Sequence, residues 1–184
     1  MPGRTHALFA ATVLLATIGC AETAHRSVSL ADAQPVELLQ NDFNNISQSG
    51  EFYFAGWPSP AGLETLQQQG VKTVVVIKPP DMVDMKFGES ERAFAESLGM
   101  RIVYLPISPN DFDSKDVDRF SDLVDHNEGP MLIHCGSSNT VGGLWAAYLH
   151  REQGVELEEA IRLGETAGLR SDSMREAARR VATE

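Results

Sequence analysis

The feature that most constrains the fold of this chain is an apolar run that ends in His134-Cys135 and opens into a loop of small and polar residues. Residues 131–133 are apolar and fit a buried strand, while residues 144–152 are amphipathic and fit a helix. A strand that leads through a short loop into a helix places Cys135 near unpaired N–H groups and the positive end of the helix dipole. Both favour the thiolate, which is the nucleophilic form of cysteine, and the same loop suits a tetrahedral oxyanion.

The rest of the chain alternates between two kinds of segment, which predicts the fold class. Apolar runs that fit strands and segments with helical spacing follow one another, the strands at residues 52–55, 73–77, 101–105 and 131–134, the helices at residues 60–69, 89–98, 143–153, 156–167 and 172–182. Ser114 is the expected N-cap of one further helix. We therefore expect an α/β fold with a mainly parallel central sheet that is flanked by helices on both faces.

In such a sheet the ligand site lies beyond the carboxyl ends of the strands. That edge carries Lys78, the loop at residues 108–113 and the loop that begins at Cys135. We expect the anion-binding residues to be those of the cysteine loop together with the strand-end lysine, namely Gly136, Ser137, Ser138, Asn139, Thr140, Val141, Gly142 and Lys78. No second His or Cys stands at ligand spacing from His134 or Cys135, so neither a metal nor another cofactor is expected.

The N-terminal segment has the features of an export signal rather than of a folded element. Residues 1–20 contain one early arginine and an uncharged run at residues 7–18, which is too short to span a bilayer. The run ends in a lipobox-like sequence before Cys20, which is the expected lipidation site, and ordinary signal cleavage remains the alternative. We therefore expect an exported, periplasmic or membrane-anchored bacterial protein with a flexible tether at residues 21–41 and a single domain at residues 42–184.

The charge of the chain limits its partners. The net charge of −11 argues against binding to nucleic acid and to anionic membrane surfaces, so contact with a membrane is expected only through the N-terminal lipid. A negative chain does not attract a phosphorylated substrate at long range. Any affinity for anions must therefore come from groups close to the loop.

Several segments together resemble one family. They are Gly56-Trp57-Pro58 after a strand, Gly70-Val71-Lys72-Thr73 before the next, His134-Cys135 at the loop, Val141-Gly142-Gly143-Leu144-Trp145-Ala146 after it, and Glu158-Glu159-Ala160 before Ala167-Gly168-Leu169. Over about residues 43–170 the chain is similar to the beta-lactamase-hydrolase-like, protein-tyrosine-phosphatase-like family, within the dual-specificity-type cysteine phosphatases. Two departures stand out, because Trp57 replaces a glutamine and no arginine stands at Thr140 or Val141, where the family or its superfamily carries one.

The resemblance implies a phosphate-like anion or phosphorylated substrate, Cys135 as the nucleophile and Asp111 as the acid that protonates the leaving group, with Asp113 as the alternative acid. Loss of a bidentate arginine should slow phosphoryl transfer by roughly two to four orders of magnitude. Lys78 is the candidate substitute, although a lysine does not reproduce the guanidinium fork.

Three functions remain open at this point. The first is a weakly active cysteine-dependent phosphatase, and the second is an inactive relative that binds an anion or a phosphorylated partner. The third is a sulfurtransferase, because residues 135–140 are similar to the rhodanese-type loop of mercaptopyruvate sulfurtransferases, which runs Cys-Gly-Ser-Gly-Val-Thr.

Overall fold

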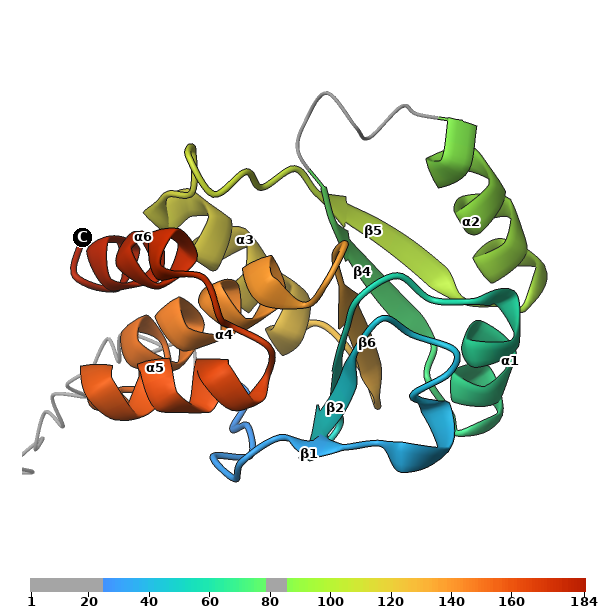
Figure 1. The fold of residues 1–184 in the computed structure, drawn as a ribbon, viewed down its shortest axis with the longest axis horizontal. Coiled ribbons are helices and arrows are strands. Elements are labelled where there is room, and N and C mark those ends of the chain that lie inside the picture. Colours follow the sequence, from blue (N-terminus) through green and yellow to red (C-terminus); the bar gives the residue numbers. More distant parts are fainter. Residues whose placement is uncertain (1–24, 79–85) are drawn as a thin grey trace, which may run out of the picture.

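The computed structural model describes residues 25–78 and 86–184, and within them the chain forms one six-stranded sheet between two helical layers (Figure 1). The strands are β1 (Gln34–Pro35), β2 (Ile46–Ser49), β3 (Phe52–Ala55), β4 (Thr73–Ile77), β5 (Arg101–Leu105) and β6 (Met131–His134). They lie in the order β1-β2-β3-β6-β4-β5. Strands β3, β6, β4 and β5 are parallel, while β1 and β2 extend one edge in antiparallel fashion. The predicted α/β class with a mainly parallel sheet is confirmed.

In the described residues, six α-helices cover the two faces of the sheet. They are α1 (Pro60–Gln68), α2 (Lys86–Ser97), α3 (Ser114–Asp125), α4 (Asn139–Arg151), α5 (Leu157–Thr166) and α6 (Asp172–Ala182). Figure 1 shows α1 and α2 on one face and α3 to α6 on the other. Alternate side chains of β6 enter the two layers, with Met131 and Ile133 on the side of α3 to α6 and Leu132 on the side of α1 and α2. Two apolar cores therefore hold β6, and with it the start of the cysteine loop, between them.

The described part of the segment predicted as a tether belongs to the domain. Residues 25–41 pack on the sheet instead of extending freely, since Ala33 and Leu39 are buried and β1 pairs with β2. The Arg26 guanidinium also forms an ion pair with Glu51. The physical reason is that this stretch carries enough apolar and hydrogen-bonding groups to cover the edge strand β2. Signal cleavage, lipidation at Cys20 and the exported location concern residues 1–20, which lie outside the described residues, so they stay predictions.

Within the described part of the chain, no helix is both long and apolar enough to cross a membrane. Strand β2 was missed because only Ile46 of its four residues, Ile46 to Ser49, is apolar, so the segment shows neither an apolar run nor an alternation. The N-cap of α3 is Asp113 rather than Ser114, because Asp113 and Asp116 form a reciprocal capping box.

Helix α4 begins at Asn139, four residues before the predicted start at residue 143. Glycines at residues 142 and 143 lower helix propensity, which favoured a longer loop in the sequence. They are needed for packing, since a Cβ at Gly142 would lie 2.2 Å from the Leu169 nitrogen and one at Gly143 would lie 2.4 Å from Met174 Cε. Tertiary contact with the segment after α5 therefore overrides the local preference.

Candidate active site

The parallel strands deliver Cys135 to the expected edge of the sheet. Cys135 follows β6 directly, and its N–H group donates a hydrogen bond to the Ala55 carbonyl at 3.2 Å. The residue is a free thiol and is 5% exposed. Residues Gly136 and Ser137 after it are partly exposed. The sulfur thus lies at the base of a loop whose first residues reach the surface.

Helix α4, which the loop opens, has no side-chain cap at its N-terminus. Its N-cap residue Ser138 makes no capping hydrogen bond. Side chains cap the other α-helices whose N-caps are described, namely Ser59 for α1, Asp113 for α3, Glu156 for α5 and Ser171 for α6. The first-turn N–H groups of α4 therefore lack the side-chain acceptor that the other α-helices have. An anion is the other kind of acceptor that such groups favour.

Ser138 also has an unusual backbone. Its φ of 68° makes it the one non-glycine residue with positive φ in the described chain. A left-handed serine costs free energy, on the order of 1–3 kcal/mol, and persists only where its surroundings hold it. Its buried hydroxyl donates to the Ala167 carbonyl at 2.7 Å. The side chain of Ser138 therefore supports the turn of the loop and is not directed at a ligand.

Asn139 joins the loop to the start of α6. Its Oδ1 accepts hydrogen bonds from the backbone N–H groups of Arg170 and Ser171, both at 2.9 Å, and its Nδ2 donates to Ser171 Oγ at 3.0 Å. Asn139 was predicted to offer its amide to an anion. The structure instead uses that amide to fix the cysteine loop against the segment between α5 and α6.

Asn139→Ala is expected to destabilise the domain by about 2–3 kcal/mol, since it removes three hydrogen bonds and leaves two N–H groups without their acceptor. Urea unfolding measures the change. Asn139→Asp keeps an acceptor for both N–H groups and should recover most of the loss. Equal stability of Asn139→Ala and the wild type would show that these three hydrogen bonds contribute nothing to the free energy of unfolding.

The other wall of the loop comes from the segment after β3. Asn44 Nδ2 donates to the Gly136 carbonyl at 3.0 Å, and a Cβ at Gly136 would lie 3.5 Å from Trp57 Nε1. Gly56 allows this approach, because a Cβ there would lie 3.1 Å from Ser137 Cα and 2.7 Å from Asn44 Cβ. Gly56 and Trp57, which belong to one of the segments that carry the family resemblance, thus pack directly against the cysteine loop.

A buried charge cluster lies behind the loop. Glu91 of α2 is placed between Lys78 and His134, with its Oε2 at 3.4 Å from Lys78 Nζ and its Oε1 at 2.7 Å from His134 Nε2. The second contact is at ion-pair distance without the alignment of a hydrogen bond. The Lys78 ammonium also lies 5.0 Å from the ring centre of Trp57 and 5.4 Å from that of Tyr104. All three charged or ionisable groups are at most 4% exposed.

This cluster changes the interpretation of Lys78. Burial alone raises the pKa of Glu91, but its contacts with His134 and Lys78 outweigh burial and hold that pKa below its usual range. The carboxylate is therefore ionised at neutral pH and compensates the charge of Lys78. Lys78 serves a buried ion pair, which argues against its predicted role as the substitute for the arginine in the loop.

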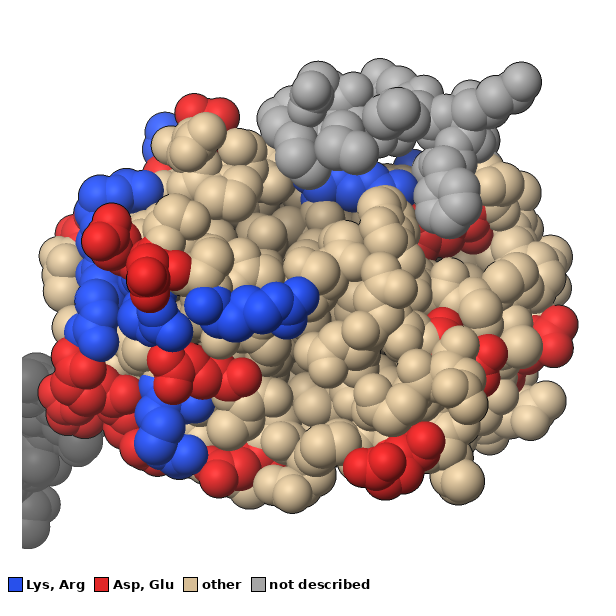
Figure 2. All heavy atoms as spheres, in the orientation of Figure 1, with Lys and Arg blue, Asp and Glu red and all other residues tan. Residues whose placement is uncertain are grey.

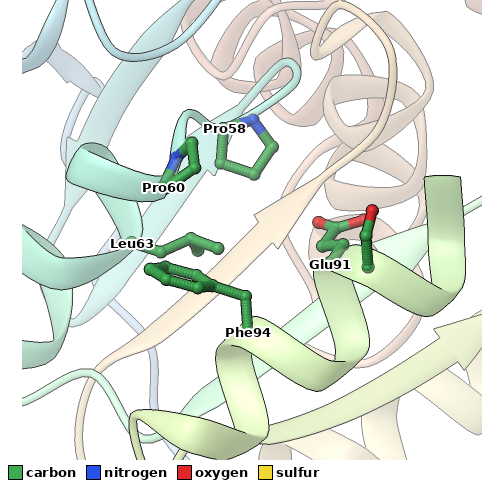
Figure 3. Close-up of a pocket in the computed structure, with 6 residues that line it drawn as sticks. Pro58, Pro60, Leu63, Glu91 and Phe94 are labelled. Atoms are coloured by element: carbon green, nitrogen blue, oxygen red, sulfur yellow. The ribbon is translucent and has the colours of Figure 1, made fainter.

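A pocket of about 290 Å³ opens between α1 and α2 (Figure 3). Its lining is mostly apolar and consists of Pro58, Pro60, Leu63, Ser90, Glu91 and Phe94. Figure 3 shows Phe94 facing Leu63, with the Glu91 carboxylate at the other side of the space. Glu91 connects the pocket to His134, so the pocket adjoins the support of the cysteine loop rather than its mouth.

The remaining predicted site residues lie either in the first turn of α4 or in the loop before α3. Thr140 is half-buried in the first turn of α4, whereas Val141 and Gly142 are buried in the contact of α4 with its neighbours. Asp111 is exposed in the turn between β5 and α3, at the same edge of the sheet as Cys135. Asp113 is occupied as the α3 cap, so Asp111 stays the candidate acid.

Three residues at the site had no sequence signal of their own. Asn44 and Glu91 are isolated polar residues in segments without a motif, and Arg170 follows the Ala167-Gly168-Leu169 segment without being part of it. Each touches the loop or its support only after the chain folds. Arg170 donates from Nη2 to the Ser137 carbonyl at 2.5 Å. A covarying partner in related sequences is the kind of signal that would have found them.

Comparison with known proteins agrees with this geometry. A search of curated proteins found no match. Similar solved structures include a putative phosphatase from Neisseria meningitidis, with 23% identity over 71% of this chain and 92% of that chain and a TM-score of 0.59. TpbA from P. aeruginosa has 24% identity over 83% of this chain and 89% of that chain, with a TM-score of 0.62. Identities this low establish a shared fold.

A family model covers nearly the whole described domain. Residues 25–179 match the family described as DSP-PTPase phosphatase fused to NAD+ kinase. The match starts at residue 25, which agrees with the packing of residues 25–41 on the sheet. The chain therefore belongs to this family of dual-specificity-type phosphatase domains, and its fold is that of a cysteine-phosphatase-like domain.

Proposed function

We propose that this chain is a weakly active, cysteine-dependent phosphatase that acts on phosphate monoesters. The observation that carries the proposal is the uncapped N-terminus of α4, which begins four residues after the free thiol of Cys135. Those N–H groups suit the equatorial oxygens of a transferring phosphoryl group. A structure of TpbA, 22% identical to this chain, holds phosphotyrosine, which supports a phosphorylated substrate for this chain as well.

The proposed chemistry uses two residues. The Cys135 thiolate forms a bond to phosphorus while the bond from phosphorus to the ester oxygen breaks, and the Asp111 carboxyl group gives its proton to that oxygen. Water then attacks the phosphocysteine, releases inorganic phosphate and restores the thiolate, and the Asp111 carboxylate accepts the proton of the water. The absence of an arginine at residues 140 and 141 leaves transition-state charge less well stabilised, which accounts for the low rate.

Hydrolysis of a small aryl phosphate tests the proposal. The wild type should turn the substrate over slowly, and Cys135→Ser, which keeps the size of the side chain, should fall to the rate of the buffer alone. Equal rates for the two proteins would reject the enzyme. Binding of inorganic phosphate without any turnover would instead identify an inactive, anion-binding member.

The sulfurtransferase alternative is tested by a separate experiment. In such an enzyme the Cys135 thiolate would take one sulfur from thiosulfate or mercaptopyruvate as a persulfide, with release of sulfite or pyruvate, and mass spectrometry detects the added sulfur. We expect the mass to stay unchanged, because the family that matches residues 25–179 is one of phosphatases.

A further inference from the structure

Arg170 is held against the cysteine loop by its backbone and by its side chain. It lies in the segment between α5 and α6, and its N–H group donates to Asn139 Oδ1. Its guanidinium donates from Nη2 to the Ser137 carbonyl at 2.5 Å and from Nη1 to the Gly168 carbonyl at 3.3 Å. The positively charged guanidinium of Arg170 therefore contacts Ser137, two positions after Cys135.

Arg170 differs from the neighbouring arginines, whose charges are compensated by carboxylates. Figure 2 shows Lys and Arg gathered over the helical layer of α5 and α6, interleaved with Asp and Glu. Most of these arginines form ion pairs, Arg162 with Asp32 and Glu159, Arg175 with Glu165 and Asp172, Arg179 with Glu158, and Arg180 with Glu184. Among residues 25–78 and 90–184, no carboxylate forms an ion pair with Arg170. Its only side-chain contacts described are with two neutral carbonyls.

The side chain also has the freedom and the donors to bind an anion. Arg170 is exposed, and its guanidinium has five N–H donors, of which the two carbonyl contacts use only a part. A guanidinium that exchanges a neutral carbonyl for an oxyanion gains a charge-assisted hydrogen bond, which is roughly twice as strong as a neutral one. The exchange is favoured only when an anion is present in the loop.

We propose that Arg170 supplies the guanidinium of the anion site, from outside the loop that carries it in relatives. This inference rests on the proposed function, since it names the group that binds the phosphoryl oxygens there. In the free protein the guanidinium rests on Ser137, and with a phosphate monoester or phosphate in the loop it donates to the anion. Lys78 does not take this part, because its charge is buried and paired with Glu91.

Binding of inorganic phosphate to three variants tests this role. Arg170→Met should weaken the affinity for phosphate at least about tenfold. The affinity of Arg170→Lys should lie between those of Arg170→Met and the wild type, because lysine keeps the charge but not the bidentate geometry of the guanidinium. Arg175→Met is the matched control, because Arg175 is nearby on α6 but paired with two carboxylates, and it should bind phosphate like the wild type. Titration calorimetry gives the affinities, and thermal unfolding without phosphate checks that each variant folds.

A chemical readout separates contact with the anion from a merely structural role. Phenylglyoxal modifies exposed arginines, and peptide mass spectrometry locates the adduct. Inorganic phosphate should protect Arg170 from modification and leave the exposed Arg101 unprotected. Both residues occur in the wild-type protein, so this measurement does not depend on a variant.

The outcomes distinguish the two proposals. If the wild type binds phosphate but Arg170→Met binds it equally well, or phosphate does not protect Arg170, the role of Arg170 is wrong and the anion site stands. If the wild type neither binds phosphate nor hydrolyses an aryl phosphate, the proposed function itself is wrong. Weakened binding in Arg170→Met together with protection in the wild type supports the role of Arg170, and slow turnover of the aryl phosphate by the wild type supports the proposed function.

Discussion

Thr140→Arg is expected to raise the rate of aryl-phosphate hydrolysis at least about a hundredfold over the wild type. Thr140 stands where the phosphatase branch that the chain resembles carries its arginine. It lies in the uncapped first turn of α4 and is half-buried, so a longer side chain can reach the mouth of the loop. A guanidinium there would make two charge-assisted hydrogen bonds to the phosphoryl group, with most of their effect on the transition state.

Two variants serve as controls for this gain. Thr140→Lys adds the charge without the fork and should gain much less activity. Val141→Arg tests the other spacing of the superfamily and should fail to fold, because Val141 is 1% exposed and a guanidinium there would be buried among apolar side chains. If folded Thr140→Arg is no faster than Thr140→Lys, the loop has changed by more than one side chain.

The two arginine proposals are linked through this variant. If Arg170 already supplies a guanidinium to the anion, then a second one at residue 140 should help less in the wild-type background than in Arg170→Met. The steady-state rates of the four proteins form a double-mutant cycle, and a departure from additivity measures the overlap of the two groups.

The central sheet was predictable because its strands carry a local signal. Residues 73–77 are a continuous β-branched and apolar run, which is typical of a strand buried on both faces, and the strand before Cys135 is equally clear. The start of α4 was not predictable in the same way. Its glycines are unfavourable in an isolated helix, and the close approach of Gly164, Leu169 and Met174 explains them.

The position of Cys135 followed from the sequence, but the roles of its neighbours did not. Local chemistry indicated that Ser138 and Asn139 would face an anion, whereas the fold assigns both side chains to the segment that contains Ala167 and Ser171. Ser137 is separated from Arg170 by 33 positions, and Asn44 from Gly136 by 92. A pattern within one segment contains no information on contacts of that kind.

The buried cluster behind the loop carries the second large expected effect. Glu91→Gln is expected to lower the free energy of unfolding at pH 7 by about 3–5 kcal/mol, because it leaves the Lys78 ammonium buried without its counter-charge. Glu96→Gln is the matched control on the same helix. Its carboxylate is 57% exposed and 3.9 Å from Arg92, so the change should stay below about 1 kcal/mol.

The dependence of this effect on pH follows from the direction of the pKa shift. The pKa of Glu91 is lower in the folded protein than in the unfolded chain, so the folded state gains stability at pH values above the unfolded value. That gain is lost as the pH falls through the folded pKa. The difference between the wild type and Glu91→Gln should therefore be full at pH 7 and shrink below the ordinary carboxyl pKa of about 4.3, as urea unfolding at several pH values will measure.

A second change should restore much of what Glu91→Gln loses. Lys78→Met in the same protein removes the buried charge and keeps an apolar side chain between the Trp57 and Tyr104 rings, and replacing a buried ion pair by apolar groups is often neutral. Because His134 directly precedes Cys135 and lies against Glu91, the single variant should also lower aryl-phosphate hydrolysis. Unchanged stability of Glu91→Gln at pH 7 would mean that the cluster is not a buried ion pair in solution, and the support of the cysteine loop would then have to come from the hydrogen bonds of Asn44, Ser138 and Asn139.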